Sequence, residues 1–229
     1  LIYDCVCLLI VPVDSSSVNG TALAGFNSIT QGATWTVTNV TFDLDSTDVS
    51  LLESAIDDAG NQYVVWANAS GNPPSGTGIY YSMREAGNLS WRNPIRVQPE
   101  SVKTAVFPAI VAGGNGKLGI AYYASNSTGN PAHMPTGSQW LLNYTYVSDA
   151  RNGTFTHLQA DPNPVKNGSI CQGGACKWHN RSFGDYMGIT RLVDGRVSIS
   201  YSTLWGAADI ETATEAPIRF AQQIDGGRL

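Results

Sequence analysis

Short apolar runs separated by Gly, Asn, Asp and Pro make up most of the chain, and helical periodicity is nearly absent. Within the runs, β-branched and aromatic residues are frequent, which is typical of strands. The apolar first segment, 1–13, alternates in the same way, carries Asp4 and is too short to span a bilayer. We therefore expect a strand there rather than a signal peptide, and an all-β chain overall.

One hairpin pattern recurs three times, at 55–67, 109–123 and 189–201. In each copy an apolar strand leads through a Gly-centred turn into a second strand with an aromatic residue at or near its end. Glycine permits the positive φ that such tight turns require. Because the second strands are apolar on both faces, each sheet needs a neighbour on either side. The repeat therefore predicts a β-propeller whose blades have four antiparallel strands.

Two further segments resemble the Asp-box, whose pattern is Ser-x-Asp-x-Gly-x-Thr-Trp. Ser28–Trp35 matches it with Thr30 in place of the Asp, and Ser82–Trp91 is a longer and looser version. In such a box the glycine makes the turn and the hydroxyl groups satisfy turn amides. The tryptophan is buried between blades, so we expect Trp35 and Trp91 to lie there.

From about Ser28 onward the chain resembles the sialidase-like superfamily of Asp-box propellers, in its extracellular microbial branch. The likeness is closest in 91–97, in 107–110 and in 170–186. The resemblance implies blades around a central channel, usually six. A blade takes roughly 50 residues, so about four are represented. We expect residues 1–229 to form one incomplete propeller domain, an excerpt of a longer chain, with closure by another chain or copy as the alternative.

The resemblance also implies what a sialidase would need: three arginines around a substrate carboxylate, a Tyr paired with a Glu, and an Asp acid. The family's early Arg-Ile/Leu-Pro motif is missing from this stretch, so the catalytic residues stay unknown. Arg181, Asp185 and Tyr186 can be matched, and they are the candidate ligand-binding residues at the channel mouth. The simpler interpretation is that Arg181 pairs with Asp185 while Tyr186 packs between blades.

Composition narrows the possible partners. Charged residues make up 14% of the chain, the formal net charge is -5, and Lys and Arg never stand side by side. A nucleic-acid backbone requires a basic patch, so nucleic acid is excluded. No Gly-rich phosphate loop opens a helix, which argues against nucleotides. Glycans, other surface proteins and copies of the chain itself remain as partners, and we expect no membrane-spanning segment.

Asn-x-Ser/Thr sequons indicate a secretory route, because composition alone would give roughly three of them. N-linked glycans attach to exposed sites of proteins that enter that route. We therefore predict an extracellular glycoprotein, secreted or on the cell surface. The nine sequons start at Asn19, Asn39, Asn68, Asn88, Asn126, Asn143, Asn152, Asn167 and Asn180.

The four cysteines fit the same compartment. Cys171 and Cys176 bracket a flexible Gln-Gly-Gly-Ala loop, which favours a disulfide between them. A direct bond between Cys5 and Cys7 would be strained on a strand, so their pairing stays open. The spacings Cys-x-Cys and Cys-x4-Cys fit a zinc site poorly.

Other polar residues offer little chemistry. We expect no cofactor; calcium is the alternative at clustered aspartates that are otherwise exposed turn residues. These are Asp57 with Asp58, and Asp43, Asp45 and Asp48. Three histidines, His133, His157 and His179, sit in loops without metal-ligand spacing. Five glutamates offer no pair whose separation can be inferred: Glu53, Glu85, Glu100, Glu211 and Glu215.

Two functions follow from these patterns. Our main prediction is a non-catalytic surface propeller that binds glycans or proteins, or that assembles into an extracellular layer. The missing motif, the dense sequons and the low charge favour it. The alternative is a sialidase-like glycoside hydrolase whose remaining catalytic residues lie outside this stretch.

Overall fold

The computed structural model describes residues 7–15, 20–28, 33–44, 52–69, 76–170, 187–204 and 217–229. In these residues the regular structure is strand, apart from one short 3-10 turn, η1 (Pro131–His133). The prediction of an all-β chain is therefore confirmed. None of the helical structure in these ranges is long and apolar enough to cross a membrane.

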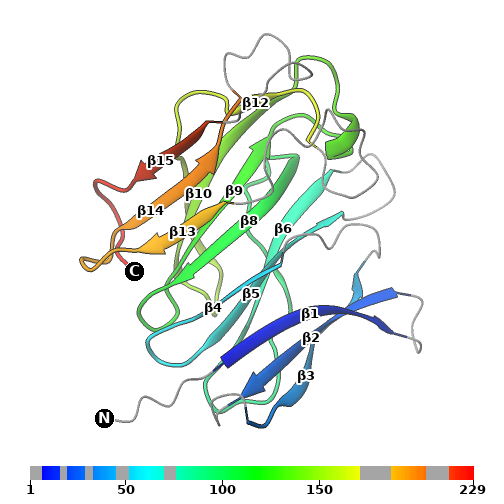
Figure 1. Cartoon of the computed structure of the whole chain (residues 1–229), viewed down its shortest axis with the longest axis vertical. Coiled ribbons are helices and arrows are strands. Elements are labelled where there is room, and N and C mark those ends of the chain that lie inside the picture. Colours follow the sequence, from blue (N-terminus) through cyan, green and yellow to red (C-terminus); the bar gives the residue numbers. More distant parts are fainter. Residues whose placement is uncertain are drawn as a thin grey trace.

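Four antiparallel sheets follow one another along the chain, and we call them blades 1 to 4 (Figure 1). Blade 1 contains β1 (Cys7–Ser15), β2 (Gly20–Ser28) and β3 (Thr36–Leu44). Blade 2 contains β4 (Glu53–Ile56), β5 (Gln62–Ala69), β6 (Thr77–Arg84) and β7 (Ile95–Arg96). Blade 3 contains β8 (Thr104–Ala112), β9 (Leu118–Ser125), β10 (Gln139–Asp149) and β11 (Thr154–Gln159), with β12 (Lys166–Asn167) beside β10. Blade 4 contains β13 (Gly188–Arg191), β14 (Val197–Ser202) and β15 (Ile218–Gln222).

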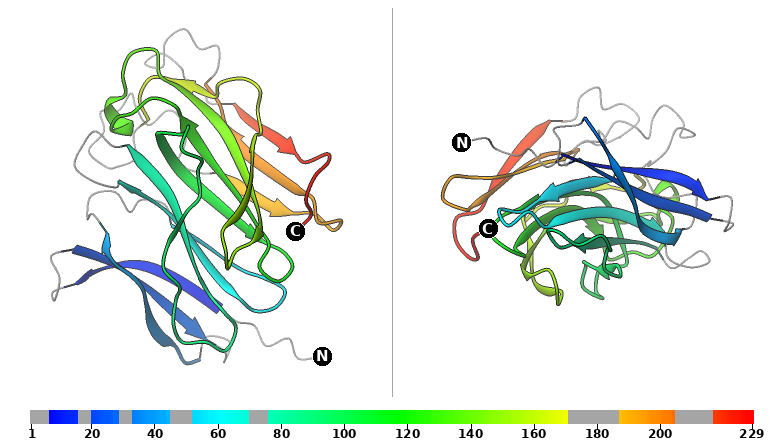
Figure 2. Two further views of the ribbon diagram at one scale, coloured as in Figure 1. Left: turned by 180° about the vertical axis from the view of Figure 1, so that it is seen from behind. Right: turned by 90° about the horizontal axis from the view of Figure 1, so that it is seen from below.

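The sheets are blades of a β-propeller. The first strands of consecutive blades lie next to one another, β1 beside β4, β4 beside β8 and β8 beside β13 (Figure 2). The predicted number of blades is confirmed. Blade 2 has four strands and blade 3 has four along its main path, whereas the described parts of blades 1 and 4 have three each.

All three predicted hairpins are present, as β4–β5, β8–β9 and β13–β14. Gly60, Gly116 and Gly195 stand in their turns with φ of 84°, 79° and 79°. A side chain would strain the backbone at such angles, which is why the glycines mark the turns in the sequence.

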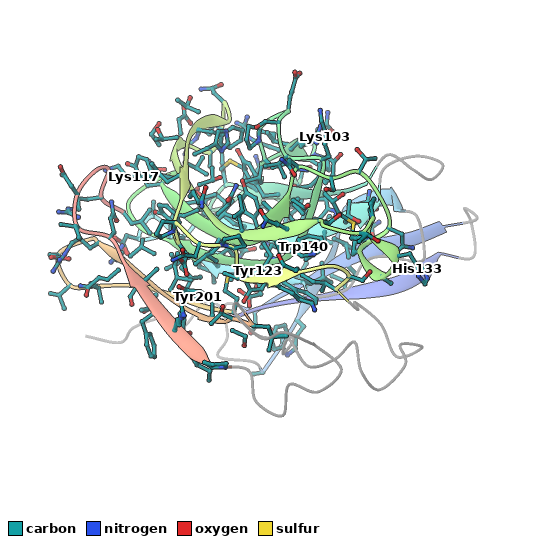
Figure 3. All side chains as sticks on the ribbon, turned by 90° about the horizontal axis from the view of Figure 1, so that it is seen from above. Lys103, Lys117, Tyr123, His133, Trp140 and Tyr201 are labelled. Atoms are coloured by element: carbon teal, nitrogen blue, oxygen red, sulfur yellow. The ribbon has the colours of Figure 1, made fainter. Side chains whose placement is uncertain are left out.

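Apolar side chains fill the spaces between blades. Between blades 3 and 4 the core contains Phe107, Tyr123, Trp140 and Tyr201. Figure 3 shows the last three of these in the interior, between the strands. Full burial of one large apolar side chain contributes about 1.5–3 kcal/mol, so these interfaces hold the blades together.

The two tryptophans expected between blades behave differently. Trp91 is half-buried and packs on the core between blades 1 and 2, and its Nε1 donates to Thr38 Oγ1 over 3.1 Å. Trp35 is 45% exposed, so the expectation that it is buried was wrong. Residues two apart on a strand share a face, and Trp35 lies on the side of β3 that also exposes Val37, opposite Thr38 and Val40.

The Asp57 carboxylate links the first hairpin turn to blade 3 through hydrogen bonds. Its buried carboxylate accepts hydrogen bonds from Ala59 N, Asn61 N and Asn61 Nδ2 at 2.9 Å each, and from Tyr63 Oη at 2.8 Å. It also accepts one from Gly116 N of blade 3 at 2.9 Å. Burial alone would raise the pKa of the Asp57 carboxyl, but the hydrogen bonds from Gly116, Asn61 and Tyr63 outweigh it and leave the pKa below its usual value.

Replacing Asp57 by Asn should lower the free energy of unfolding by about 2–3 kcal/mol, because an amide nitrogen would face several backbone donors. The folded pKa is lowered, so the carboxylate stabilises the fold above its unfolded pKa of about 3.9, and this contribution disappears as pH falls through the folded pKa. The free energies of unfolding of the wild type and of Asp57→Asn, measured by denaturant titration, should therefore converge as the pH is lowered from neutral to acid.

Asp58→Asn is the matched control. The Asp58 side chain is 62% exposed and pairs with Arg191 at 2.7 Å, and a surface pair of this kind contributes at most about 1 kcal/mol. Equal losses in the two variants would contradict the structural role of Asp57.

Candidate functional site

The innermost strands of blades 2, 3 and 4 converge on one axis. Asp58, just beyond β4, shows this most directly: its backbone N donates to Gly113 O of blade 3 over 2.9 Å. Its carboxylate meets Arg191 of blade 4, although blades 2 and 4 are not neighbours in the chain order. In the described residues β4, β8 and β13 each pair with a single strand of their own blade, so their other edges face this axis. We call the surface formed by these inner edges the channel wall.

Glu53, the first residue of β4, lies where the inner edges of blades 2 and 3 meet. Its Oε2 accepts a hydrogen bond from Ile110 N of β8 over 3.2 Å. Since β9 occupies the other edge of β8, this amide points towards the axis. The carboxyl group therefore lies at the channel wall, and it is partly buried there.

Burial raises the pKa of the Glu53 carboxyl above its usual value, although the hydrogen bond from Ile110 acts in the opposite direction. A carboxyl group in a low-dielectric site keeps its proton to higher pH, because the charged form is poorly solvated. This is the property that a general acid needs near neutral pH.

The inner strand of blade 3 is irregular just before Ile110. The register of β8 on β9 shifts between Val106 and Ala109, and Phe107 has φ of 53°. A residue other than glycine at such an angle costs about 1–3 kcal/mol and persists only where its surroundings hold it. Here the buried Phe107 ring packs edge-on against Tyr123, with ring centroids 6.2 Å apart. Bulges of this kind redirect a strand and are frequent beside active sites.

The ligand-binding residues predicted from the sequence, Arg181, Asp185 and Tyr186, lie outside the described residues. The same holds for Cys171 and Cys176, so their disulfide stays a prediction. Asp185 and Tyr186 directly precede Met187, which is followed by the inner strand β13. From the sequence, Glu53 was only one of five glutamates that offered no carboxylate pair of inferable separation. The signal that could have found it is its place two residues before the predicted hairpin 55–67, where the first strand of that hairpin begins in the structure.

The predicted glycosylation sites fall into three groups. Asn39, Asn88, Asn126, Asn152 and Asn167 are exposed. Asn68 and Asn143 are partly buried within strands, and their Oδ1 atoms are buried, which leaves less room for a glycan. Asn19 and Asn180 lie outside the described residues. Glycosylation stays a prediction at each of them.

Metal chemistry finds no support at the expected places. The Asp57 carboxylate is occupied by the protein's own donors, and the side chains of Asp43, Asp45 and Asp48 lie outside the described part. Among the side chains described, no three His, Cys, Asp or Glu gather as ligands. His133 is exposed in η1, His157 Nδ1 lies 3.0 Å from Thr145 Oγ1, and His179 is not described.

No family model matches the sequence, and no curated protein matches it. Among solved structures, the chain is similar to an alpha-L-arabinanase of Penicillium chrysogenum in complex with arabinobiose, with 14% identity and a TM-score of 0.49. That match covers 85% of this chain but 56% of the arabinanase, so the chain spans little more than half its length.

Two other solved structures give similar values. A thermostable family-43 glycoside hydrolase has 12% identity and a TM-score of 0.49, over 97% of this chain and 69% of its own. An endo-1,4-beta-xylanase of Bacteroides thetaiotaomicron has 17% identity and a TM-score of 0.39, over 89% and 67%.

These structures correct our main functional prediction. A non-catalytic binding or structural propeller was expected because a family motif is missing. The similar structures are glycoside hydrolases, and they favour the alternative, a glycoside hydrolase, over that prediction. The motif was a poor criterion because the fold carries many different sites.

The environment of Glu53 predicts that the wild-type protein is less stable than Glu53→Gln at neutral pH. The amide can still accept from Ile110 N but carries no charge to desolvate. Because the folded pKa is raised, the wild type loses stability relative to the variant as pH rises from the unfolded value of about 4.3 through the folded pKa. Thermal unfolding of both proteins between pH 4 and 8 measures this. A melting-temperature difference that does not change with pH would contradict the raised pKa.

Proposed function

We propose that this chain is the propeller part of a glycoside hydrolase in which Glu53 is the general acid. The observation that carries the proposal is the protonation-favouring carboxyl group at the channel wall, held by Ile110 N over 3.2 Å. A glycosidic oxygen is a poor leaving group until it is protonated, and an acid with a raised pKa protonates it near neutral pH.

A second carboxylate is required on the other side of the scissile bond. We assign this role to Asp185, because it precedes the inner strand β13 by three residues. In the reaction Glu53 gives its proton to the leaving oxygen as the bond to the anomeric carbon breaks. Asp185 assists the addition of water there, and the elements of water end up divided between the two products.

The sugar that the protein hydrolyses can be identified with a panel of aryl glycosides. Arabinofuranosides and xylosides belong in it because the similar structures are named for acting on such substrates. A sialoside belongs in it because of the Asp-box resemblance, with Arg181 as the candidate contact to its carboxylate.

We also propose that the propeller is of the Asp-box type and extracellular. For the box, support comes from the segment that starts at Ser82: Ser82 Oγ donates to Arg92 O over 2.6 Å, and Arg92 N donates to Met83 O over 2.8 Å, which closes the loop. For the location, support comes from the exposed sequons and from the expected disulfide of Cys171 and Cys176.

Glu53→Gln should lower kcat/KM for the hydrolysed glycoside by about 10²–10⁴-fold, the usual contribution of a general acid. The loss should be largest for an alkyl or methylumbelliferyl leaving group and small for 2,4-dinitrophenol, which departs without a proton. Initial rates on both leaving groups measure it.

The exposed Glu100→Gln is the matched control and should keep wild-type rates. Equal losses on both leaving groups would contradict the acid role of Glu53. Absence of turnover by the wild type on the whole panel would contradict the hydrolase proposal itself.

A further inference from the structure

A groove lies between blades 1 and 2, at the end of β6. It has a volume of 320 Å³. Its walls come from the strand of blade 1 that starts at Thr36, from the turn at Gly60, and from the loop that follows Arg84. Arg84 itself lines the groove, together with Gln62 and Asn88.

In the part of the chain that the structure describes, the Arg84 guanidinium is a buried charge without a counter-ion. The residue is 3% exposed. Its Nε and Nη2 donate to the neutral Gln62 Oε1 over 3.1 and 2.5 Å, and its Cζ lies 5.6 Å from the centre of the Trp91 ring. In the described part of the chain, no carboxylate forms an ion pair with it. A buried cation of this kind is costly unless an anion compensates it.

The carboxylate nearest in sequence is already engaged. Glu85 Oε1 accepts from Arg92 over 3.0 Å and from Arg151 over 2.8 Å. Glu85 is therefore shared between two guanidinium groups outside the groove, and it does not pair with Arg84.

The geometry of the side chain decides which ligand would fit. A guanidinium has five N–H donors in a planar fork, and Gln62 takes two of them. The remaining donors suit the paired oxygens of a carboxylate or sulfate group. Thr36 and Asn88 offer neutral hydrogen-bonding groups beside it, as hydroxyl-rich ligands require.

We propose that the groove between blades 1 and 2 is an oxyanion-binding site in which Arg84 receives the carboxylate of an acidic sugar. It is separate from the channel carboxyl Glu53 and does not depend on the hydrolase proposal. Trp91 holds the guanidinium in place through its ring, and Gln62 orients the fork.

The test is the thermal unfolding of the whole chain at constant ionic strength with four probes: glucuronate, acetate, sulfate and glucose. A ligand at ten times its Kd should raise the melting temperature by about 2–5 °C, because it binds the folded state alone. Glucuronate should produce this shift and glucose should not. Tryptophan fluorescence gives a second reading, since Trp91 lies under the guanidinium.

Arg84→Met removes the charge at similar length and should weaken glucuronate binding by about tenfold or more. Without ligand it should unfold at the wild-type temperature or above, because the uncompensated charge is gone. Arg84→Lys keeps the charge without the fork and should bind with intermediate affinity. Arg196→Met is the matched control, since Arg196 pairs with Asp194 on blade 4 and should leave binding unchanged.

The probes also separate the sources of the anion. A larger shift with glucuronate than with acetate or sulfate supports an acidic sugar, and equal shifts support an oxyanion site for small anions. No shift with any anion on the wild type, equal shifts with glucose and glucuronate, or full binding by Arg84→Met would overturn the inference. Glu53→Gln should keep the glucuronate shift, so failure of one proposal leaves the other standing.

Discussion

The whole architecture depends on sheets that are apolar on both faces. Every side chain of β9 is buried, so neither face of blade 3 can be left in water. Blade 2 covers one face with Tyr63, Tyr81 and their neighbours, and blade 4 covers the other with Val197, Ile199 and Tyr201. Strands twist with a fixed hand, so sheets stacked in this way fan out around an axis on which their first strands meet. In this arrangement both faces of blade 3 are kept away from water.

This stacking also explains why polar groups meet where the inner strands lie side by side. In the residues described, β4, β8 and β13 each have one edge without a strand partner, and buried backbone amides need acceptors. Glu53 supplies one for Ile110 N, while Gly113 O accepts from Asp58 N. A carboxyl group that performs this task sits between two blades and loses solvation, so its pKa rises. The packing of the blades against each other is therefore also the cause of the raised pKa of Glu53.

Features with local sequence signals could be predicted from the sequence, and features that depend on distant residues could not. The hairpins were predictable because their signals are local: Gly60, Gly116 and Gly195 stand between runs of strand-forming residues. The position of Trp35 was not, since the pattern does not say which face of a strand meets the next blade. Glu53 was recognisable as a glutamate at a strand end, but its environment comes from Ile110, which is far along the chain. The prediction of a non-catalytic protein rested on a missing motif, and a motif says little about function in a fold that carries many different sites.

Blade 2 contains two buried charged residues, Asp57 and Arg84, whose hydrogen-bond partners differ. Asp57 has five donors around its carboxylate, so its charge is used up in joining a turn to the neighbouring blade. Arg84 is buried to a similar extent, yet its hydrogen-bond partner is a single neutral amide oxygen. Asp57 lies in the turn before β5 and Arg84 is the last residue of β6, but among the described residues only the Asp57 charge has strong partners. A fold that retains an uncompensated guanidinium beside an open groove loses stability there, and an anionic ligand is the partner that would restore it.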